Sequence, residues 1–144
     1  MQERMDKGYL LDSNVIIGYL AGKIPVTGMK AISEIVDKTP RISVISQIEI
    51  LRFNDTPERE TVLNNFVNSS VIYSLNPNIV KQTIALCKKI RIKLPDAIIA
   101  ATALNENLIL VTRNINDFKN VPGIELLNPW DLVPDTVEQV TGSS

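Results

Sequence analysis

The chain has 144 residues, a net charge of −1, a single cysteine and no histidine. The absence of histidine excludes a Ser-His-Asp triad, a Cys-His pair, a histidine-based ribonuclease mechanism and zinc sites that use imidazole. Acid–base chemistry must therefore come from carboxylates, lysines, tyrosines or metal-bound water. No apolar run is long enough to cross a bilayer, and the near-neutral charge argues against non-specific polyanion binding over the whole surface.

The length favours one domain, which we expect to span residues 8–134 between an N-terminal tail (1–7) and a loose C-terminal tail (135–144). The first residues, MQERMDKG, are charged and lack the apolar core of a secretory signal. Cys87 has no partner for an internal disulfide, which fits a reducing cytosol, and its place in an apolar helical pattern predicts a buried structural thiol. We therefore expect a cytoplasmic protein.

The first half of the chain predicts two strands and three helices. Gly8–Asp12 is typical of a buried strand, and a turn at Asp12, Ser13 and Asn14 leads into a short helix that ends near Gly22. A second helix is predicted over Met29–Lys38, with its apolar residues at helical spacing, and Pro40 ends it. A second strand is expected over Arg41–Ile45. Ser46 is then a candidate N-cap, with Glu49 three residues later at the spacing of a capping box.

The second half continues the alternation. Helices are predicted to begin at Pro57, Pro77 and Pro95, because proline is favoured in the first helical turn. The apolar stripe of the Pro77 helix includes Val80, Ile84, Cys87 and Ile90. Strands are predicted over Val71–Ser74, Leu108–Thr112 and Ile124–Leu127, and the residues Asn114 to Asp117 form a turn. Alternating strands and helices favour an α/β fold with a mostly parallel central sheet.

Four separated acidic residues interrupt or adjoin apolar segments: Asp12, Glu49, Asp96 and Asp117. Each has an ordinary explanation on its own, as an N-cap, a capping-box residue, a first-turn carboxylate or a turn residue. In a parallel α/β sheet, however, the ligand crevice lies at the carboxyl ends of the strands, and the pattern sends several of these residues to that edge. Four carboxylates brought together would repel unless a hard cation such as Mg²⁺ joined them.

Several polar residues near these positions are candidates for supporting functions. Ser13, Asn14, Ser46 and Thr112 could orient carboxylates or hold metal-bound water, with helix capping as the alternative explanation and the one we favour for Ser46. Arg52, Lys93 and Arg113 lie near acidic positions in the sequence and are candidates to contact a phosphate. Trp130 is predicted to be a packing anchor beside the last strand.

The motifs LLDSNVII, ISVISQIEIL and LPDAIIAATALNENLILVTRNINDF, in this order, make the chain resemble the PIN-domain family, and within it the VapC-type toxins. The resemblance extends from Leu10 to Trp130. It implies a three-layer α/β/α sandwich and an endoribonuclease that depends on one or two Mg²⁺ or Mn²⁺ ions. The metal ligands and catalytic residues would be Asp12, Glu49, Asp96 and Asp117. Asn14, Thr112 and Asn114 would support them, and the fourth ligand in some relatives corresponds to Asn114 instead of Asp117.

The resemblance also implies partners: an RNA substrate, a small VapB-like antitoxin that covers the acidic groove, and a second copy in a homodimer. Two alternatives stay open. A degenerate PIN domain could bind RNA or a protein without cutting it, and Asn114 is the residue that permits this interpretation. An aspartyl-phosphate enzyme or receiver domain could use Asp12 as phosphate acceptor, although this chain has Asn14 where the dehalogenase-like phosphatases have a second Asp. The sequence does not name the RNA, its cleavage site or the antitoxin.

Overall fold

The computed structural model describes residues 7–134. Its strands are β1 (Tyr9–Leu11), β2 (Arg41–Ser43), β3 (Val71–Tyr73), β4 (Ile109–Val111) and β5 (Leu126–Leu127). Its helices are α2 (Ser13–Leu20), α3 (Val26–Lys38), α4 (Val44–Leu51), α5 (Pro57–Asn68), α6 (Pro77–Lys89), α7 (Leu94–Asn105), α8 (Ile115–Phe118) and the 3-10 helix η1 (Pro129–Asp131). No helix in this part of the chain is both long enough and apolar enough to span a membrane.

All paired strands run parallel. The order β1-β4-β5 forms one sheet and β2-β3 forms another, with Leu10 opposite Leu110 and Ile42 opposite Ile72. The two sheets meet where β1 lies beside β2. Parallel pairing brings the carboxyl ends of the strands to a common edge. The expected parallel α/β architecture is therefore confirmed.

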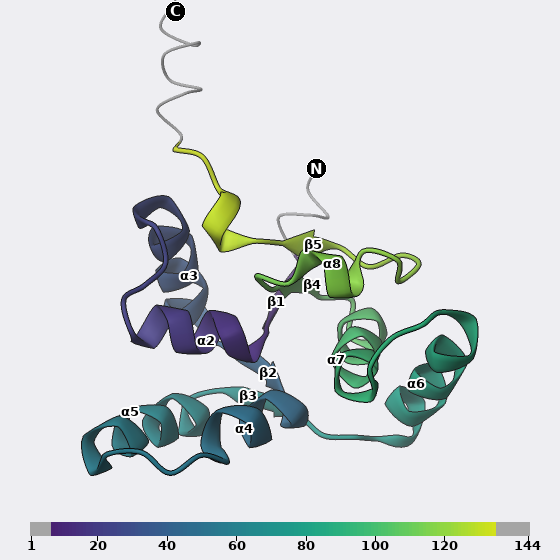
Figure 1. Ribbon diagram of the computed structural model, residues 1–144, viewed down its shortest axis with the longest axis horizontal. Coiled ribbons are helices and arrows are strands. Elements are labelled where there is room, and N and C mark those ends of the chain that lie inside the picture. The colour runs from purple at the N-terminus through teal and green to yellow at the C-terminus, as the bar shows by residue number, and fades with distance from the viewer. Residues whose placement is uncertain (1–6, 135–144) are drawn as a thin grey trace, which may run out of the picture.

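The strands separate two apolar clusters, and alternate residues of β1 and β4 point into each. Leu10 and Leu110 are buried against α6, α7 and α8, whereas Leu11 and Val111 are buried with residues of α2, α3, α4 and α5. Side chains of a strand alternate between faces, so each face is covered by helices only if the fold has three layers. Figure 1 shows α2 and α3 on one side of β1 and β4, and α6 and α7 on the other. The predicted three-layer sandwich is confirmed.

Helices begin where the sequence supplies capping groups. The side chains of Asp12, Thr56 and Asn76 accept hydrogen bonds from the first backbone N–H groups of α2, α5 and α6. The predicted N-cap at Ser46 is wrong. Ser43 caps α4 by accepting a 3.0 Å bond from the N–H of Ile45, so β2 ends at Ser43 and the helix starts earlier than expected. Ser46 instead lies buried within α4, where its hydroxyl has no partner among the described residues.

The buried face of α6 also differs from the prediction. Ile79, Thr83 and Leu86 are buried, whereas Ile84 is 52% exposed and Cys87 is exposed. Both sets of residues recur at helical spacing, so the apolar pattern alone could not choose between two faces that differ by one residue. The expectation of a buried Cys87 is therefore wrong.

Smaller differences concern element boundaries. The second helix, α3, begins at Val26, three residues before the predicted start at Met29, with Pro25 as its N-cap residue. The turn around Asp117 is the single-turn helix α8. Trp130 packs against the apolar cluster beneath α2 and α3, as predicted for a packing anchor. The predicted tails over residues 1–7 and 135–144 lie outside the described residues, apart from Lys7.

Candidate active site at the carboxyl edge of the sheet

Asp12 is the most tightly held acidic residue. It follows β1, continues the ladder by donating its backbone N–H to Val111 (2.9 Å), and is 4% exposed. Its Oδ1 accepts from the N–H of Ser13 (2.8 Å), and its Oδ2 accepts from Thr112 Oγ1 (2.8 Å) and Asn14 Nδ2 (3.1 Å). A carboxylate has about four acceptor positions, so Oδ1 keeps one that these partners do not use.

The same residue caps α2, which explains part of its environment but not all of it. Burial raises the pKa of Asp12 above its ordinary value of 3.8, and the negative charge of Glu49 raises it further, while the bonds from Thr112 and Ser13 lower it. A cap that served stability alone would not need a second carboxylate nearby. Asp12 is thus both an N-cap, as the simpler explanation held, and a member of an acidic cluster.

Glu49 reaches the cluster from α4. It lies past the end of β2 on the helical turn that follows Ser46, and its Oε1 accepts a 2.9 Å hydrogen bond from Ser13 Oγ. Ser13 is the first residue of α2, so this bond links the starts of two helices that follow neighbouring strands. The predicted capping-box function of Glu49 is wrong, because α4 begins at Val44 rather than after Ser46.

Asp96 stands in the first turn of α7 and is half-buried. Burial raises its pKa to about 6, and the charges of Asp117, Asp12 and Glu49 contribute in that order, while Lys93 lowers it. Each of the other three carboxylates therefore lies close enough to disfavour ionisation of Asp96. The fold brings together all four acidic residues that the sequence singled out.

Asp117 lies in α8, which follows β4, and Asn114 immediately precedes this helix. Asp117 is exposed and is the largest charge influence on Asp96, so it lies on the open side of the cluster. Asn114 is the N-cap residue of α8, but its side chain makes no capping bond and no hydrogen bond to the rest of residues 7–134. Asp117 is therefore the residue of this segment that acts electrostatically on Asp96.

Asn14 and Thr112 connect the two strands that supply the site. Thr112 is fully buried, and its Oγ1 donates to Asp12 while accepting from the N–H of Asn114 (3.0 Å). Asn14 donates to Asp12 and accepts from the N–H of Arg113 (3.0 Å). These bonds fix the β4–α8 connection against the start of α2, a hundred residues away in the chain.

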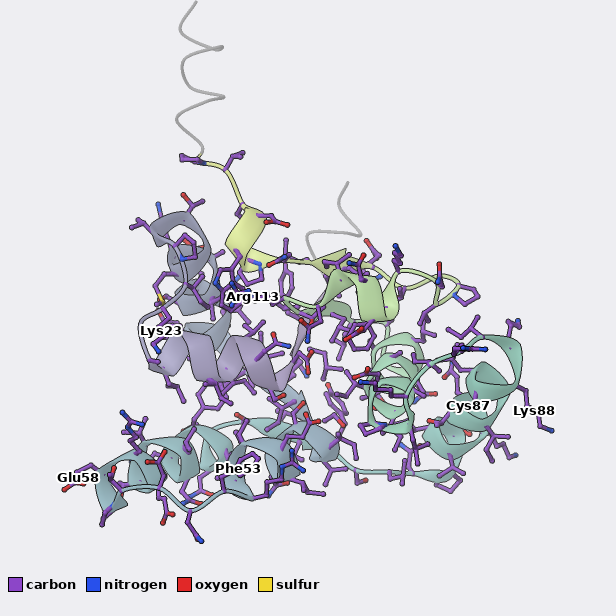
Figure 2. All side chains as sticks on the ribbon, in the orientation of Figure 1. Lys23, Phe53, Glu58, Cys87, Lys88 and Arg113 are labelled. Carbon is purple, nitrogen blue, oxygen red and sulfur yellow. The ribbon has the colours of Figure 1, made fainter. Side chains whose placement is uncertain are left out.

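The three predicted basic residues have different positions. Lys93 is the N-cap residue of α7 and lowers the pKa of Asp96, so it faces the cluster. Arg113 stacks over Trp130 at 4.6 Å, next to Thr112. Arg52 stacks over Phe53 at 4.6 Å at the end of α4, and Figure 2 shows Phe53 on the α4–α5 side of the molecule, away from η1. Arg52 is thus separate from the Arg113–Trp130 pair, and it follows Glu49 by about one helical turn.

The donor set suits a hard divalent cation, because it consists of carboxylate oxygens that repel one another and that a cation would neutralise. Residues 7–134 contain no group of three such side chains close enough to form a ready-made cage. Mg²⁺ commonly takes one or two protein carboxylates and keeps several waters, so an open cluster of this kind is compatible with it. Asp12, with a free acceptor position on Oδ1, and Asp96 are the residues best suited to hold it.

Two side-chain contacts of the site could not be predicted from the sequence. Ser13 was a candidate for orienting carboxylates, but its bond to Glu49 depends on α2 and α4 lying side by side. Trp130 was expected only to pack, and its contact with Arg113 depends on β4 and β5 being neighbours. Neither pairing leaves a local signal, since the partners are 36 and 17 positions apart.

Comparison with known proteins agrees with this geometry. The family model for the PIN domain matches residues 9–124. No curated protein matches the chain significantly. Among solved structures, a toxin–antitoxin complex from Klebsiella pneumoniae is 26% identical, with a TM-score of 0.69 over 87% of this chain and 100% of that one.

Two further structures share the fold at lower identity. The DNA-bound VapBC from Salmonella typhimurium is 21% identical, with a TM-score of 0.72 over 85% of this chain and 98% of that one. The VapBC2 from Rickettsia felis, bound to a DNA fragment of its promoter, is 24% identical, with a TM-score of 0.67 over 83% and 97%. With a family match over most of its length and the acidic cluster at the expected edge, the chain belongs to the PIN-domain family.

Proposed function

We propose that this protein is a metal-dependent endoribonuclease of the VapC toxin type. The observation that carries the proposal is the convergence of four carboxylates from four separate segments, where each of three raises the pKa of the fourth, Asp96. Such repulsion opposes folding, so a fold that retains it is expected to use the cluster. The PIN-domain match and the likeness to solved toxin–antitoxin complexes support the same conclusion.

A bound Mg²⁺ or Mn²⁺ ion would supply a water of lowered pKa as the nucleophile for attack on an RNA phosphodiester. The protein's contribution is to hold the oxygens that receive it. Thr112 and Asn14 keep Asp12 in one orientation, and Ser13 does the same for Glu49. Lys93 favours the ionised form of Asp96, which is the form that can accept a cation. The chemistry needs no histidine, in agreement with the composition.

The direct test is RNA cleavage by the Asp96→Asn variant. We expect a loss of more than about 100-fold, since changes to residues that only support a metal ligand already cost about 10–100-fold. Glu58→Gln is a matched control, because Glu58 also lies in the first turn of a helix and Figure 2 shows it at the far end of α5. Circular dichroism should show both variants folded. Unchanged cleavage by Asp96→Asn would remove this residue from the mechanism.

We further propose that a small VapB-like antitoxin covers this site. The likeness to toxin–antitoxin complexes supports the proposal. Exposed apolar residues beside the cluster also support it: Ile17, one turn beyond Ser13, is 49% exposed, and Ile48, next to Glu49, is 54% exposed. Co-expression with the product of a short reading frame immediately upstream should give a complex without nuclease activity. An upstream product that neither binds nor inhibits would contradict this part of the proposal.

The family resemblance also leads us to propose a homodimer. Sedimentation equilibrium of the isolated chain should give about twice the 16.0 kDa mass of one copy. A single-copy mass at micromolar concentration would contradict the dimer and would leave the nuclease proposal untouched.

A second function is favoured by a specific observation: the carboxylates are not spaced as a ready-made cage, and Asn114 contributes no charge. The protein would then be a PIN-domain module that binds RNA or a protein without cutting it. Titration with Mn²⁺ followed by a cleavage assay separates the two functions. Metal binding with turnover supports the nuclease, and RNA binding without turnover at any metal concentration supports the module.

A further inference from the structure

Arg113 is fixed at the border of the acidic cluster from three directions. Its backbone N–H donates to Asn14 Oδ1 (3.0 Å), its carbonyl accepts from Asn128 Nδ2 (3.4 Å), and its guanidinium lies 4.6 Å from the centre of the Trp130 ring. The two hydrogen bonds hold the backbone of Arg113, and the ring contact favours side-chain rotamers that place the charge over Trp130. The restricted charge stands one residue from Thr112, which holds Asp12.

Two glycines leave the space that the Pro129–Trp130 segment occupies. A methyl group on Gly18 of α2 would come within 2.8 Å of the Trp130 ring, and one on Gly28 of α3 would come within 2.0 Å of the Pro129 carbonyl oxygen. Asn128 accepts from the N–H of Trp130 (2.9 Å) and so ties the same segment to Arg113. The ring is therefore a fixed support and not a mobile surface residue.

The charge on Arg113 has no ion-pair partner among residues 7–134. No carboxylate of residues 7–134 lies within 4 Å of it, whereas Lys7 and Arg59 have ion-pair partners. The cation that lowers the pKa of Asp96 is Lys93. Figure 2 shows Arg113 between η1 and α2, at the surface beside the centre of the molecule. An exposed guanidinium that has no ion-pair partner and stacks on a ring next to an anionic site suits an external anion.

From this arrangement we propose that Arg113 on its Trp130 support forms a phosphate subsite, which binds the RNA backbone at a phosphate next to the one that is cut. Trp130 is a positioning residue for this contact. The inference rests on the proposed function, because it takes the acidic cluster as the place where RNA is cleaved. It adds the path of the bound RNA. The RNA backbone leaves the acidic cluster across the β4–α8 connection towards η1.

The test is binding of a labelled single-stranded RNA oligonucleotide, measured by fluorescence anisotropy with Ca²⁺ in place of Mg²⁺ over 50–200 mM salt. We expect Arg113→Ala to weaken binding at least about tenfold, as for loss of a charged hydrogen bond. It should also reduce the slope of log affinity against log salt by about 0.7, the value for one phosphate on a single strand. Arg113→Lys should keep the slope and lose affinity, because a point charge cannot replace the planar fork.

Trp130→Leu should weaken binding about two- to fivefold, through the lost cation–π contact, and Trp130→Phe should restore most of it. In an Arg113→Ala background, Trp130→Leu should have almost no further effect. A merely structural tryptophan would instead act additively. The control Lys88→Ala removes an exposed cation from α6, which Figure 2 shows far from Arg113, and we expect it to leave affinity and slope unchanged.

Failure of this inference and failure of the proposed function are distinguishable. If wild type cleaves RNA in Mg²⁺ and Arg113→Ala keeps both affinity and salt slope, the subsite is wrong while the nuclease stands. If wild type binds RNA without cleaving it and Arg113→Ala lowers the slope, the nuclease is wrong, and Arg113 is a phosphate contact of an RNA-binding module instead. Should Trp130→Leu fail to fold, the Arg113 variants alone decide the matter.

Discussion

Charged residues lie at both ends of the parallel strands. At the edge where the strands begin (the amino edge) they are paired with protein groups, whereas at the edge where the strands end (the carboxyl edge) carboxylates cluster. At the amino edge, Lys7 forms an ion pair with Glu125, and Arg41 donates a 2.8 Å hydrogen bond to the Tyr73 hydroxyl. Lys7, Arg41 and Tyr73 line a pocket of about 570 Å³, and Glu106 adds a negative charge to its lining. At the carboxyl edge, the charges of Asp117, Asp12 and Glu49 raise the pKa of Asp96, and Lys93 is the cation that lowers it.

The difference follows from where helices begin. Asp12 caps α2 and Asp96 and Asp117 lie in the first turns of α7 and α8, so the positive ends of helix dipoles point at the carboxyl edge and partly offset the clustered charge. Helices end towards the other edge, where the dipoles present their negative ends and do not favour carboxylates, and where Lys7 and Arg41 have protein partners. An edge with balanced charge contributes to stability, whereas an edge with unbalanced charge is suited to binding.

The largest expected effect that tests this contrast compares Asp12→Asn with Glu106→Gln. Asp12→Asn should lower RNA cleavage by more than about 100-fold, as loss of a metal-binding carboxylate exceeds the 10–100-fold cost of changing a supporting residue. Stability should be maintained, because asparagine also caps helices and the repulsion with Glu49 is removed. Glu106 lines the amino-edge pocket, and Glu106→Gln should leave kcat/KM unchanged. Equal losses in the two variants would abolish the distinction.

Thr112→Val should give the next largest effect. It removes the donor to Asp12 Oδ2 and the acceptor for the N–H of Asn114, so the pKa of Asp12 rises further and the cluster loses its link to α8. We expect cleavage to fall about 10–100-fold, with a loss of about 1–3 kcal/mol in the free energy of unfolding from the unpaired buried groups.

Thr112→Ser is the matched variant, because it keeps the hydroxyl and deletes only a methyl group. Urea unfolding and initial cleavage rates measured on both variants separate the hydrogen bond from packing. The prediction is contradicted if serine and valine at this position reduce cleavage equally.

The third prediction concerns pH. Asp96 has an ordinary pKa of 3.8 in the unfolded chain and a pKa of about 6 in the folded one, so between these values the folded chain binds more protons. The free energy of unfolding of the metal-free protein should therefore fall as pH rises from about 4 to about 6, and this contribution is constant above that range. Mg²⁺ binding requires the ionised carboxylate and should release protons in the same window.

Comparison of wild type with Asp96→Asn isolates this contribution from other groups that titrate there. Urea midpoints measured at several pH values should decline less steeply in the variant. A variant with the same decline as wild type would show that Asp96 does not titrate as described.

Tyr73→Phe should have the smallest effect of these variants, and we expect that effect to be limited to interactions at the amino edge. It deletes the acceptor for the Arg41 guanidinium, and we expect a loss of about 0.5–1.5 kcal/mol in the free energy of unfolding. Cleavage and RNA affinity should not change. A loss of cleavage in a folded Tyr73→Phe variant would mean that the two edges are coupled.

The sequence predicted the fold class and the acidic residues because both depend on local patterns. Apolar strand segments, prolines in first helical turns and carboxylates just after strands are each visible within a few residues. Ser46 shows where this approach fails: two serines, Ser43 and Ser46, precede Glu49, and only the structure shows which one ends the strand. The prediction that Cys87 is buried fails for a related reason, since α6 has apolar residues on two adjacent faces.

Contacts between segments that are far apart in the chain could not be predicted from the sequence. The bond from Ser13 to Glu49 and the stacking of Arg113 on Trp130 require strand order, which a single sequence does not give. The sequence therefore indicated the candidate charged residues, whereas the hydrogen bonds and ring contacts that orient them are visible only in the structure.

The solvent-facing thiol of Cys87 has a practical consequence. It is the single cysteine of the chain, and it lies on α6, the helix that packs against the Asp96-bearing α7. A maleimide dye could be attached there in one step without engineering any residue, on a helix that contributes none of the four carboxylates. The unmodified protein should in turn be purified with a reductant, since two molecules could otherwise become covalently linked through this position.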